Sequence, residues 1–487
     1  MTEASIASIA QSALIAFVLA VALVPAARRF AIRIDVVARP RADRWHRTVV
    51  PLLGGVAIGL ATLITSLIGG LATSLPVVLA AAMAMFVMGL DDDILSLRPA
   101  TKLVAQIAAA AALVYFGFRL NWIESRLIDS ALTMVWLVGL TNAFNLLDNM
   151  DGLCAGTALI VAVMLLIGFW TGVSRDNAVA EMTLLAALAG AAAGFLVYNF
   201  PPASIFMGDS GSMLFGFTLA ALALGHEGVR ASRSDVLSVI AGPAFVLLLP
   251  IFDTSLVTVA RLLSGRSPAV GGRDHSSHRL VAIGLSERNA VLVLWALASV
   301  GGGIGLLLRN YSPDWSLYVG AIYLGGMCVF AVYLARVRVY EDLRPGQITD
   351  VTLLNATFMN RRRVVEVLVD ASLIGASYYV ATLLVFRDPE AYLRNADVFY
   401  KSLPVIVAAQ LLAFFARGLY RGIWQPFVRR DVNKVLEGLL GGTTVALLFL
   451  TAYYGYIAVS WKVVLVQAVL LAASVILTRL VGRMFPP

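Results

Sequence analysis

Long apolar runs alternate with short basic loops along most of the chain. Runs of about twenty hydrophobic residues recur, and each is long enough to cross roughly 30 Å of hydrocarbon as a helix. We count about eleven such runs before Arg336 and about four after Arg361. The pattern predicts an all-α polytopic membrane protein with a domain of about eleven helices at residues 1–335, a charged linker at 336–362 and a bundle of about four helices at 363–487.

The composition and the basic loops agree with this interpretation. Hydrophobic residues make up 60% of the chain and charged residues only 14%, so a soluble protein is excluded. Arginines crowd the loops near residues 28–47, 261–279, 336–363 and 417–434. The positive-inside rule places these loops in the cytoplasm and the N-terminus outside. Since the net charge of +8 follows membrane topology, no nucleic-acid partner is expected.

Polar residues gather at the cytoplasmic ends of the expected helices. Acidic residues follow the third expected helix, and acids and amides follow the fifth. A further acid and an amide bracket a short loop, and two histidines lie in a later loop. Such residues are costly in hydrocarbon, so their convergence on one membrane face predicts a functional site. The residues are Asp92, Asp93, Asn142, Asn145, Asp148, Asp151, Asn199, Asp209, His275 and His278.

The donor types indicate a hard cation and a phosphorylated ligand. Carboxylate and amide oxygens suit Mg²⁺, with Mn²⁺ as the alternative, and Mg²⁺ usually shares its coordination with substrate phosphates. Nearby arginines suit phosphate contacts, and the glycines beside Asp209 would let backbone N–H groups approach an anion. A metal, a cationic clamp and precise positioning are what phosphoryl transfer needs from a protein.

In these motifs the chain resembles a known family, the polyprenyl-phosphate N-acetylhexosamine-1-phosphate transferases. The matching motifs occur in the family's order and cover about residues 1–335. They are Arg44-Trp-His46 leading to Pro51–Gly55, Asp92-Asp93 with Lys102 nine residues on, the Asn142–Gly156 block, Phe206–Ser212, Asp253 in a late helix and the Arg273–Leu280 loop.

The resemblance implies an enzyme of the bacterial inner membrane whose active site is cytoplasmic. It implies transfer of N-acetylhexosamine-1-phosphate from a UDP-sugar to undecaprenyl or another polyprenyl phosphate, with release of UMP. The first choice of sugar is GlcNAc or a modified relative. Such a reaction begins the synthesis of a cell-surface glycan, for example O-antigen lipopolysaccharide or another part of the cell wall.

The resemblance also implies roles for individual residues. Asp209 and Asn145 would contact Mg²⁺, while Asp92 and Asp93 would sit beside the reacting phosphates as catalytic residues. The lipid phosphate would be held by Lys102. Further substrate-binding candidates face the nucleotide, the sugar or the diphosphate: Arg44, His46, Asn142, Asp148, Asp151, Asn199, Phe206, Arg273, His275 and His278.

Two positions depart from the family's usual motifs. The usual His-x-His-His reads His275-Ser-Ser277-His278, so that Ser277 replaces one histidine. The usual Asp-Gly-Leu-Asp-Gly reads Asp148-Asn149-Met-Asp-Gly152. The first change leaves the identity of the sugar open. The histidine-rich signature of the muramoyl-pentapeptide enzyme is absent, which disfavours a peptidoglycan substrate.

Structural explanations compete with these roles. The acidic pairs could be solvated turn residues, Lys102 could extend its charged group to the membrane surface, and Phe206 could be a packing residue. Asp253 is either functional or paired with Arg261 in the same expected helix. The alternative function is a secondary transporter with intramembrane carboxylates, which would need acids near the membrane midplane and repeated broken helices.

The C-terminal part is a separate prediction. Residues 363–487 carry no acidic cluster and no phosphate-binding loop. They resemble the membrane region that precedes the soluble domain in membrane-bound nucleotide-sugar epimerases and dehydratases, but the soluble domain is missing, so no dehydratase activity is expected. We expect these helices to form a homodimer or to dock a neighbouring enzyme.

Overall fold

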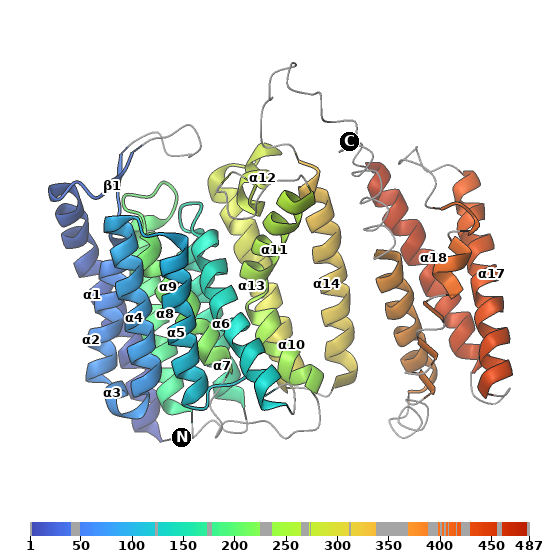
Figure 1. Cartoon of the computed structure of the whole chain (residues 1–487), viewed down its shortest axis with the longest axis horizontal. Coiled ribbons are helices and arrows are strands. Elements are labelled where there is room, and N and C mark those ends of the chain that lie inside the picture. Colours follow the sequence, from blue (N-terminus) through green and yellow to red (C-terminus); the bar gives the residue numbers. More distant parts are fainter. Residues whose placement is uncertain are drawn as a thin grey trace, which may run out of the picture. The chain divides into compact units, whose positions relative to one another are not determined.

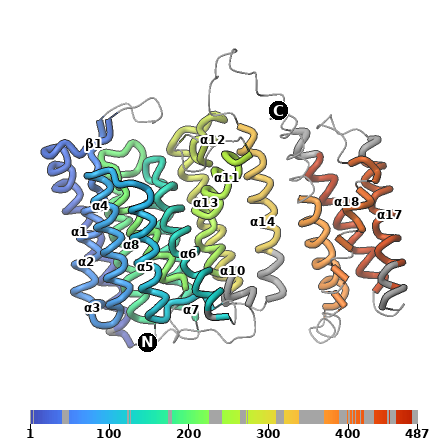
Figure 2. The backbone as a smooth tube through the Cα atoms, viewed as in Figure 1, coloured from blue at the N-terminus to red at the C-terminus, as the bar shows by residue number. Residues whose placement is uncertain are grey.

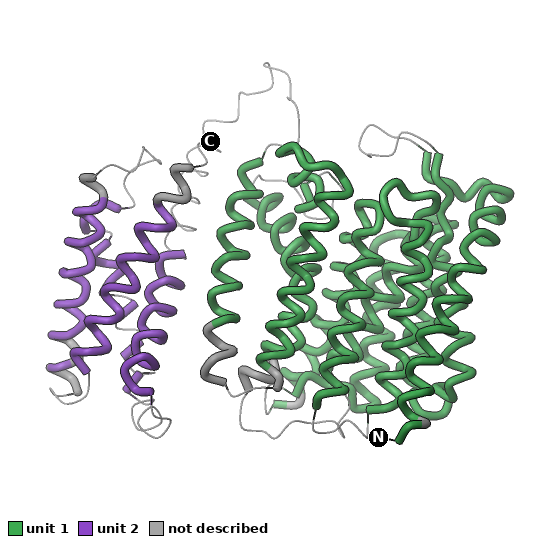
Figure 3. Tube along the Cα trace, turned by 180° about the vertical axis from the view of Figure 1, so that it is seen from behind, with its two compact units in different colours: residues 1–341 green, residues 342–487 purple. Residues whose placement is uncertain are grey.

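The computed structural model describes most of the chain. The described residues are 2–39, 49–121, 125–172, 178–224, 236–263, 272, 274–310, 313–337, 369–387, 398–399, 402–403, 406–407, 409–414, 416–419, 429–454 and 460–484. They divide into two compact units, residues 1–341 and 342–487, which are described separately (Figure 3).

Unit 1 consists of helices and one small antiparallel pair of strands (Figure 1). The strands are β1 (Val37–Ala38) and β2 (Val50–Pro51). The helices are α1 (Glu3–Arg33), α2 (Gly54–Ile68), α3 (Leu71–Ser74), α4 (Pro76–Leu95), α5 (Pro99–Tyr115), α6 (Arg126–Leu147), α7 (Leu153–Thr171), α8 (Val179–Asn199), α9 (Gly208–Leu224), α10 (Val236–Val246), α11 (Leu248–Leu263), α12 (Ser276–Ala282), α13 (Glu287–Asn310) and α14 (Pro313–Ala335).

The predicted all-α polytopic membrane fold is confirmed. Among the described residues of unit 1, five helices, including α7 and α8, are long and apolar enough to span a membrane, and α2, α5 and α9 are shorter apolar helices. Large apolar side chains such as Leu14 and Val104 are exposed, as expected where lipid rather than water is the solvent. The long helices run side by side through the unit (Figure 2).

Helix α8 forms the centre of the first half of unit 1. Most of its residues are buried, and it packs against α1, α2 and α7. Its sequence is rich in alanine and glycine, which lets neighbouring backbones approach closely, as is common between membrane helices. This tight packing fixes the end of α8, where the polar residue Asn199 begins the loop to α9.

Proline and glycine set the helix ends that carry the polar motifs. Pro76 and Pro99 occupy the first turns of α4 and α5, where the missing N–H group is not needed. Gly152 precedes α7 with φ of 74° and Gly208 begins α9 with φ of 75°, a conformation that glycine adopts readily. The chain therefore turns sharply at the points where the acidic motifs occur.

Unit 2 contains α17 (Arg429–Tyr454), α18 (Trp461–Met484) and an apolar helix at Val369–Val385, with further helical residues between 398 and 416 (Figure 3). Buried polar contacts join its helices. Arg479 Nη2 lies 2.7 Å from Asp370 Oδ2, and Gln410 Nε2 donates to Thr443 Oγ1 at 2.8 Å. With its own apolar core, unit 2 has the contacts of a separate bundle.

Candidate functional site

The acidic motifs meet at one end of the unit 1 helices. Asp92 and Asp93 lie near the C-terminal end of α4, Lys102 lies in the first turn of α5, and Asp209 lies in the first turn of α9. The turn between α6 and α7 brings Asp148 to the same end. This end lies opposite the N-terminus of the chain (Figure 1).

Lys102 bridges two carboxylates from different helices. Its Nζ atom lies 2.8 Å from Asp92 Oδ2 and 2.9 Å from Asp209 Oδ2. All three side chains are only partly exposed, so the charges attract one another more strongly than they would in bulk water. The ammonium group is thus positioned between the catalytic candidates of α4 and α9.

Asp93 binds the beginning of α9. Its Oδ1 atom accepts from the Asp209 N–H at 2.8 Å. Its Oδ2 atom accepts from the N–H of Ser210 at 3.1 Å and from the hydroxyl of Ser210 at 2.7 Å. A Cβ atom on Gly208 would lie 2.6 Å from the Asp93 carboxylate oxygens. The backbone N–H groups that were expected to approach an anion therefore bind the Asp93 carboxyl.

Asn145 and Asp148 complete the acidic site. The Nδ2 atom of Asn145 donates to Ser212 Oγ at 3.1 Å, over the first turn of α9, and Asn145 also interacts with the Asp209 carboxyl. Asp148 accepts from the backbone N–H of Gly208. Burial, together with the negative charges of Asp209, Asp93 and Asp151, raises the pKa of Asp148 to about 8.

The donor chemistry of this site fits a divalent cation. Asp209, Asn145 and Asp148 offer oxygen atoms at one end of the helices, and such oxygen donors suit a hard divalent cation. Among the described residues, no three His, Cys, Asp or Glu side chains are grouped as metal ligands. An ion held by Asp209 and Asn145 would thus complete its coordination with water and substrate phosphates, as Mg²⁺ commonly does.

The loop between α8 and α9 is held together by two of the predicted site residues. The amide of buried Asn199 is used within the protein, since Oδ1 accepts from Gly152 N–H at 2.9 Å and Nδ2 donates to the Ile205 carbonyl at 2.9 Å. Asp151 Oδ2 accepts from the Ala203 N–H at 2.7 Å. The observed contacts of both side chains stabilise the loop, and their predicted contacts with the nucleotide stay predictions.

Phe206 belongs to the same loop. Its N–H donates to the Pro51 carbonyl and its carbonyl accepts from the Gly54 N–H, both at 2.9 Å. The side chain is half-buried. These bonds join the motif at residues 51–55 to the motif at 206–212, which explains in physical terms why both motifs lie at one site. Stacking of Phe206 on a base stays a prediction.

Asn142 makes a buried amide pair. Its Nδ2 atom donates to Gln106 Oε1 at 2.7 Å and to the Val138 carbonyl at 2.8 Å. Sequence reasoning missed Gln106. It is a single amide in an alanine-rich helix, and an isolated polar residue in such a helix could have indicated a polar partner. The pair joins α5 to α6 one turn from Asn145, so it places the metal-ligand candidate relative to Lys102.

The histidine motif forms a second polar cluster. Asp253 Oδ2 lies 2.7 Å from His275 Nδ1, and Asp253 Oδ1 accepts from both the N–H and the hydroxyl of Ser276 at 2.7 and 2.6 Å. The suggested pairing of Asp253 with Arg261 is wrong, because Arg261 Nε instead donates to Asp274 Oδ2 at 3.0 Å. His278 is also buried, with its ring centroid 6.0 Å from that of His275.

Three predicted site residues lie outside the described part of the chain: Arg44, His46 and Arg273. The remaining candidates lie at or beside one end of the helices. The described acids of the site therefore do not lie near the middle of the helices, where a transporter's ion site would be expected.

Comparisons with known proteins identify the family to which the chain is similar. The family model described as glycosyl transferase family 4 matches residues 75–226. A probable undecaprenyl-phosphate N-acetylglucosaminyl 1-phosphate transferase of Bacillus subtilis (strain 168) is 31% identical, over 63% of this chain and 87% of the relative.

Two further relatives extend this result. A decaprenyl-phosphate N-acetylglucosaminephosphotransferase of Mycobacterium tuberculosis is 34% identical over 65% of this chain and 86% of the relative. A phospho-N-acetylmuramoyl-pentapeptide-transferase of Geobacillus kaustophilus is 30% identical over 63% of this chain and 98% of the relative. Since the chain covers nearly all of several such relatives and carries the clustered motifs, it belongs to the polyprenyl-phosphate N-acetylhexosamine-1-phosphate transferases of glycosyl transferase family 4.

Proposed function

We propose that this enzyme transfers N-acetylglucosamine-1-phosphate, or that of a closely modified sugar, from a UDP-sugar to polyprenyl phosphate. The observation that carries the proposal is the junction of Asp92, Lys102 and Asp209 in a chain of this family. The relatives from Bacillus and Mycobacterium, named for N-acetylglucosamine and polyprenyl phosphates, support this choice of sugar and acceptor.

The reaction balances without a proton acceptor. An oxygen of the lipid phosphate bonds to the phosphorus that carries the sugar, and the bond from that phosphorus to the oxygen bridging to UMP breaks. A phosphate monoester has a second pKa near 6, so the acceptor is mostly a dianion at pH 7 and UMP leaves as a dianion. The protein therefore has to bring two anions together rather than remove a proton.

We infer from the contacts how this task is divided among the charged residues. Both carboxyl oxygens of Asp93 accept hydrogen bonds from the first turn of α9, so we assign Asp93 a positioning role. Lys102 supplies positive charge at the junction, where it would hold the lipid phosphate. Asp92 orients the ammonium group and also accepts from the Leu97 N–H at 2.8 Å. The Asp209 carboxyl is held by its contacts with Lys102 and Asn145.

Mg²⁺, with Mn²⁺ as the alternative, is the proposed cofactor, and Asp209 and Asn145 are its proposed ligands. When bound, it would neutralise negative charge on the diphosphate. Two neighbouring residues would support these ligands without binding the metal themselves. Asp148 lies near other carboxylates, and Ser212 accepts a hydrogen bond from Asn145.

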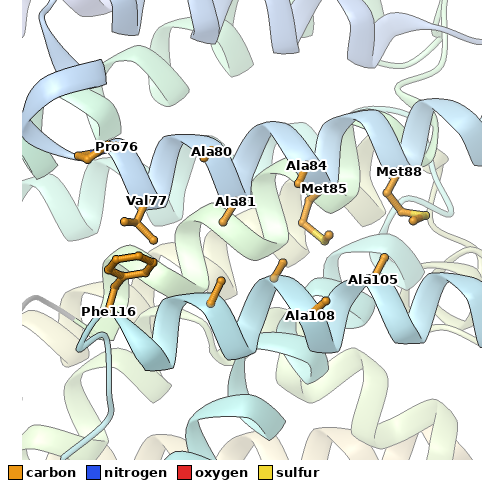
Figure 4. Close-up of a pocket in the computed structure, with 12 residues that line it drawn as sticks. Pro76, Val77, Ala80, Ala81, Ala84, Met85, Met88, Ala105, Ala108 and Phe116 are labelled. Carbon is orange, nitrogen blue, oxygen red and sulfur yellow. The ribbon is translucent and has the colours of Figure 1, made fainter.

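An apolar pocket supports a lipid acceptor. It has a volume of about 610 Å³ and lies between α4 and α5, lined by alanine, methionine and other apolar side chains (Figure 4). Met88 lies one turn before Asp92, and Ala105 lies one turn after Lys102. A phosphate bound at Lys102 would therefore leave its isoprenoid chain beside the pocket.

The cellular setting is part of the proposal. We place the site on the cytoplasmic face of a bacterial inner membrane, with the N-terminus outside, because the arginine-rich loops favour that orientation. The product would be the first lipid-linked intermediate of a cell-surface glycan. Residues 1–335 would carry the transferase, and 363–487 a dimerisation or docking bundle joined by the linker at 336–362.

The direct test is a reaction with purified full-length protein, Mg²⁺, undecaprenyl phosphate and a panel of UDP-N-acetylhexosamines. We expect UMP and a lipid diphosphate sugar of the matching mass, with UDP-GlcNAc among the active donors. Absence of UMP with every donor, in an assay where a known transferase is active, would reject the proposed function.

Replacement of the acid at the junction should remove most activity. Asp209→Asn keeps the size of the side chain but loses the charge that holds Lys102 and the proposed metal. We expect the rate to fall far more than tenfold, which corresponds to more than about 1.4 kcal/mol of transition-state stabilisation. UMP release is measured over a range of Mg²⁺ concentrations.

The neighbouring acid Asp91 provides a matched control, because its side chain is exposed in the same acidic triplet. Asp91→Asn should keep nearly the activity of the unaltered protein. An Asp209→Asn variant with near-normal turnover at ordinary Mg²⁺ would contradict the role assigned to Asp209.

Filling the pocket between α4 and α5 should weaken binding of the long acceptor. Ala108 lines the pocket, while Ala111 is exposed on the same helix and does not line it. Ala108→Leu should raise the KM for undecaprenyl phosphate severalfold, with little change for a short-chain prenyl phosphate or the UDP-sugar. Ala111→Leu should change none of these values, and equal effects of the two variants would argue against the pocket as the acceptor site.

Removal of unit 2 should leave the chemistry intact. Unit 1 ends at Glu341 and contains every described residue of the proposed site, so a chain truncated there should turn over at a rate within a few fold of the full chain. We expect a smaller assembly or loss of a partner, measured by light scattering in detergent. A stable truncated protein with unchanged assembly mass but no turnover would oppose this role for unit 2.

A further inference from the structure

The two positions that depart from the usual motifs contact each other. Ser277 Oγ donates to Asn149 Oδ1 at 2.6 Å, although the residues are far apart in the sequence. The Asn149 amide is also fixed from its other side, because Nδ2 donates to the Leu146 carbonyl at 2.8 Å. The changes from histidine to Ser277 and from glycine to Asn149 thus form one complementary donor–acceptor pair.

Each member of the pair is held by its own part of the protein. Ser277 is fully buried in α12, and the preceding residues His275 and Ser276 are bound by Asp253 of α11. Asn149 lies in the short turn between α6 and α7, directly after Asp148. Since both partners are held by further contacts, their hydrogen bond links the turn directly to α12.

Apolar packing lies next to this hydrogen bond. Leu280 of α12 belongs to the same buried cluster as Leu147, the last residue of α6, and Met150 of the turn. Such a cluster attracts the two segments but specifies their register poorly, because apolar contacts are not directional. The directional contact between Ser277 and Asn149 sets how α12 sits on the turn.

Each member of the pair adjoins a polar cluster along the chain, because Asn149 follows Asp148 and Ser277 lies between His275 and His278. The first cluster is the acidic site, which Asp148 joins through Gly208 and the charge of Asp209. The second cluster contains His275 and His278. The pocket proposed for the lipid lies between α4 and α5, apart from α12 (Figure 1).

We propose that Asn149 and Ser277 are positioning residues for the nucleotide-sugar donor. Their hydrogen bond sets the separation between the acidic turn and the histidines, so that both ends of the donor are engaged at once. The inference rests on the proposed function, and it adds two residues that act through Asp148 and the histidines. Loss of the bond lets α12 shift on its apolar contacts, which weakens binding of the donor and leaves the acceptor site unchanged.

A double-mutant cycle tests the pair. Ser277→Ala and Asn149→Ala each remove one partner, and the two changes are then combined. We expect each single variant to raise the KM for the UDP-sugar about five- to tenfold, the scale of one hydrogen bond. The double variant should be no worse than either single variant, because both remove the same interaction. The KM for undecaprenyl phosphate and inhibition by UMP, which lacks the sugar, should stay within twofold of the unaltered protein.

Ser299→Ala is the matched control, since the Ser299 hydroxyl donates to the Trp295 carbonyl within its own helix and joins no second element. It should leave the donor KM unchanged. Thermal unfolding in detergent, measured for every variant, separates loss of folding from loss of positioning. Direct titration of the unreactive donor analogue with a methylene bridge between its phosphates gives affinity without turnover.

The outcomes separate the two proposals. If the unaltered protein forms no UMP, the proposed function fails. If it is active but the single effects multiply in the double variant, or the acceptor KM and UMP inhibition change as much as the donor KM, then the positioning role of this pair is wrong while the proposed function stands.

Discussion

The contact on which the site depends is the bridge of Lys102 between Asp92 and Asp209. The carboxylates come from α4 and α9, whose ends would repel each other if the acids met without a cation. Asp93, one residue after Asp92, adds a second link between the same helices through the backbone of α9. The same acidic turn therefore carries the proposed site residue Asp92 and, through Asp93, binds the first turn of α9.

Sequence reasoning predicted the helices and most of the assembly of the site. Apolar runs predict membrane helices, and polar motifs that follow helix ends on the same side of the membrane are expected to gather at one surface. That argument placed Asp92, Lys102 and Asp209 at one face, where the structure brings them into contact. It did not predict that Asp93 would bind backbone N–H groups, because a carboxylate that binds the protein and one that binds a ligand look alike in a sequence.

Partners across helices were the least predictable feature. Asp253 and Arg261 share α11, but eight residues place them about 12 Å apart along the axis, which favours other partners. The residues that pair with them, His275 and Asp274, arrive from a separate segment that only the tertiary fold brings near. In the same way, the polar side chain of Asn199 suggested a ligand contact. Only the loop geometry shows that it accepts a hydrogen bond from Gly152 and so links the end of α8 to the start of α7.

The pocket between α4 and α5 also has a consequence for how the two substrates reach the enzyme. Ala80 and Ala84, which line it, are exposed, so the pocket is accessible from the outer side of α4, which the proposed topology would place in lipid. An acceptor that enters there arrives by lateral diffusion within the bilayer leaflet. Its effective concentration is then a mole fraction of membrane lipid, whereas the donor's is set by the aqueous phase. The enzyme would meet its two substrates in different solvents, and a change in lipid composition would alter the supply of only one of them.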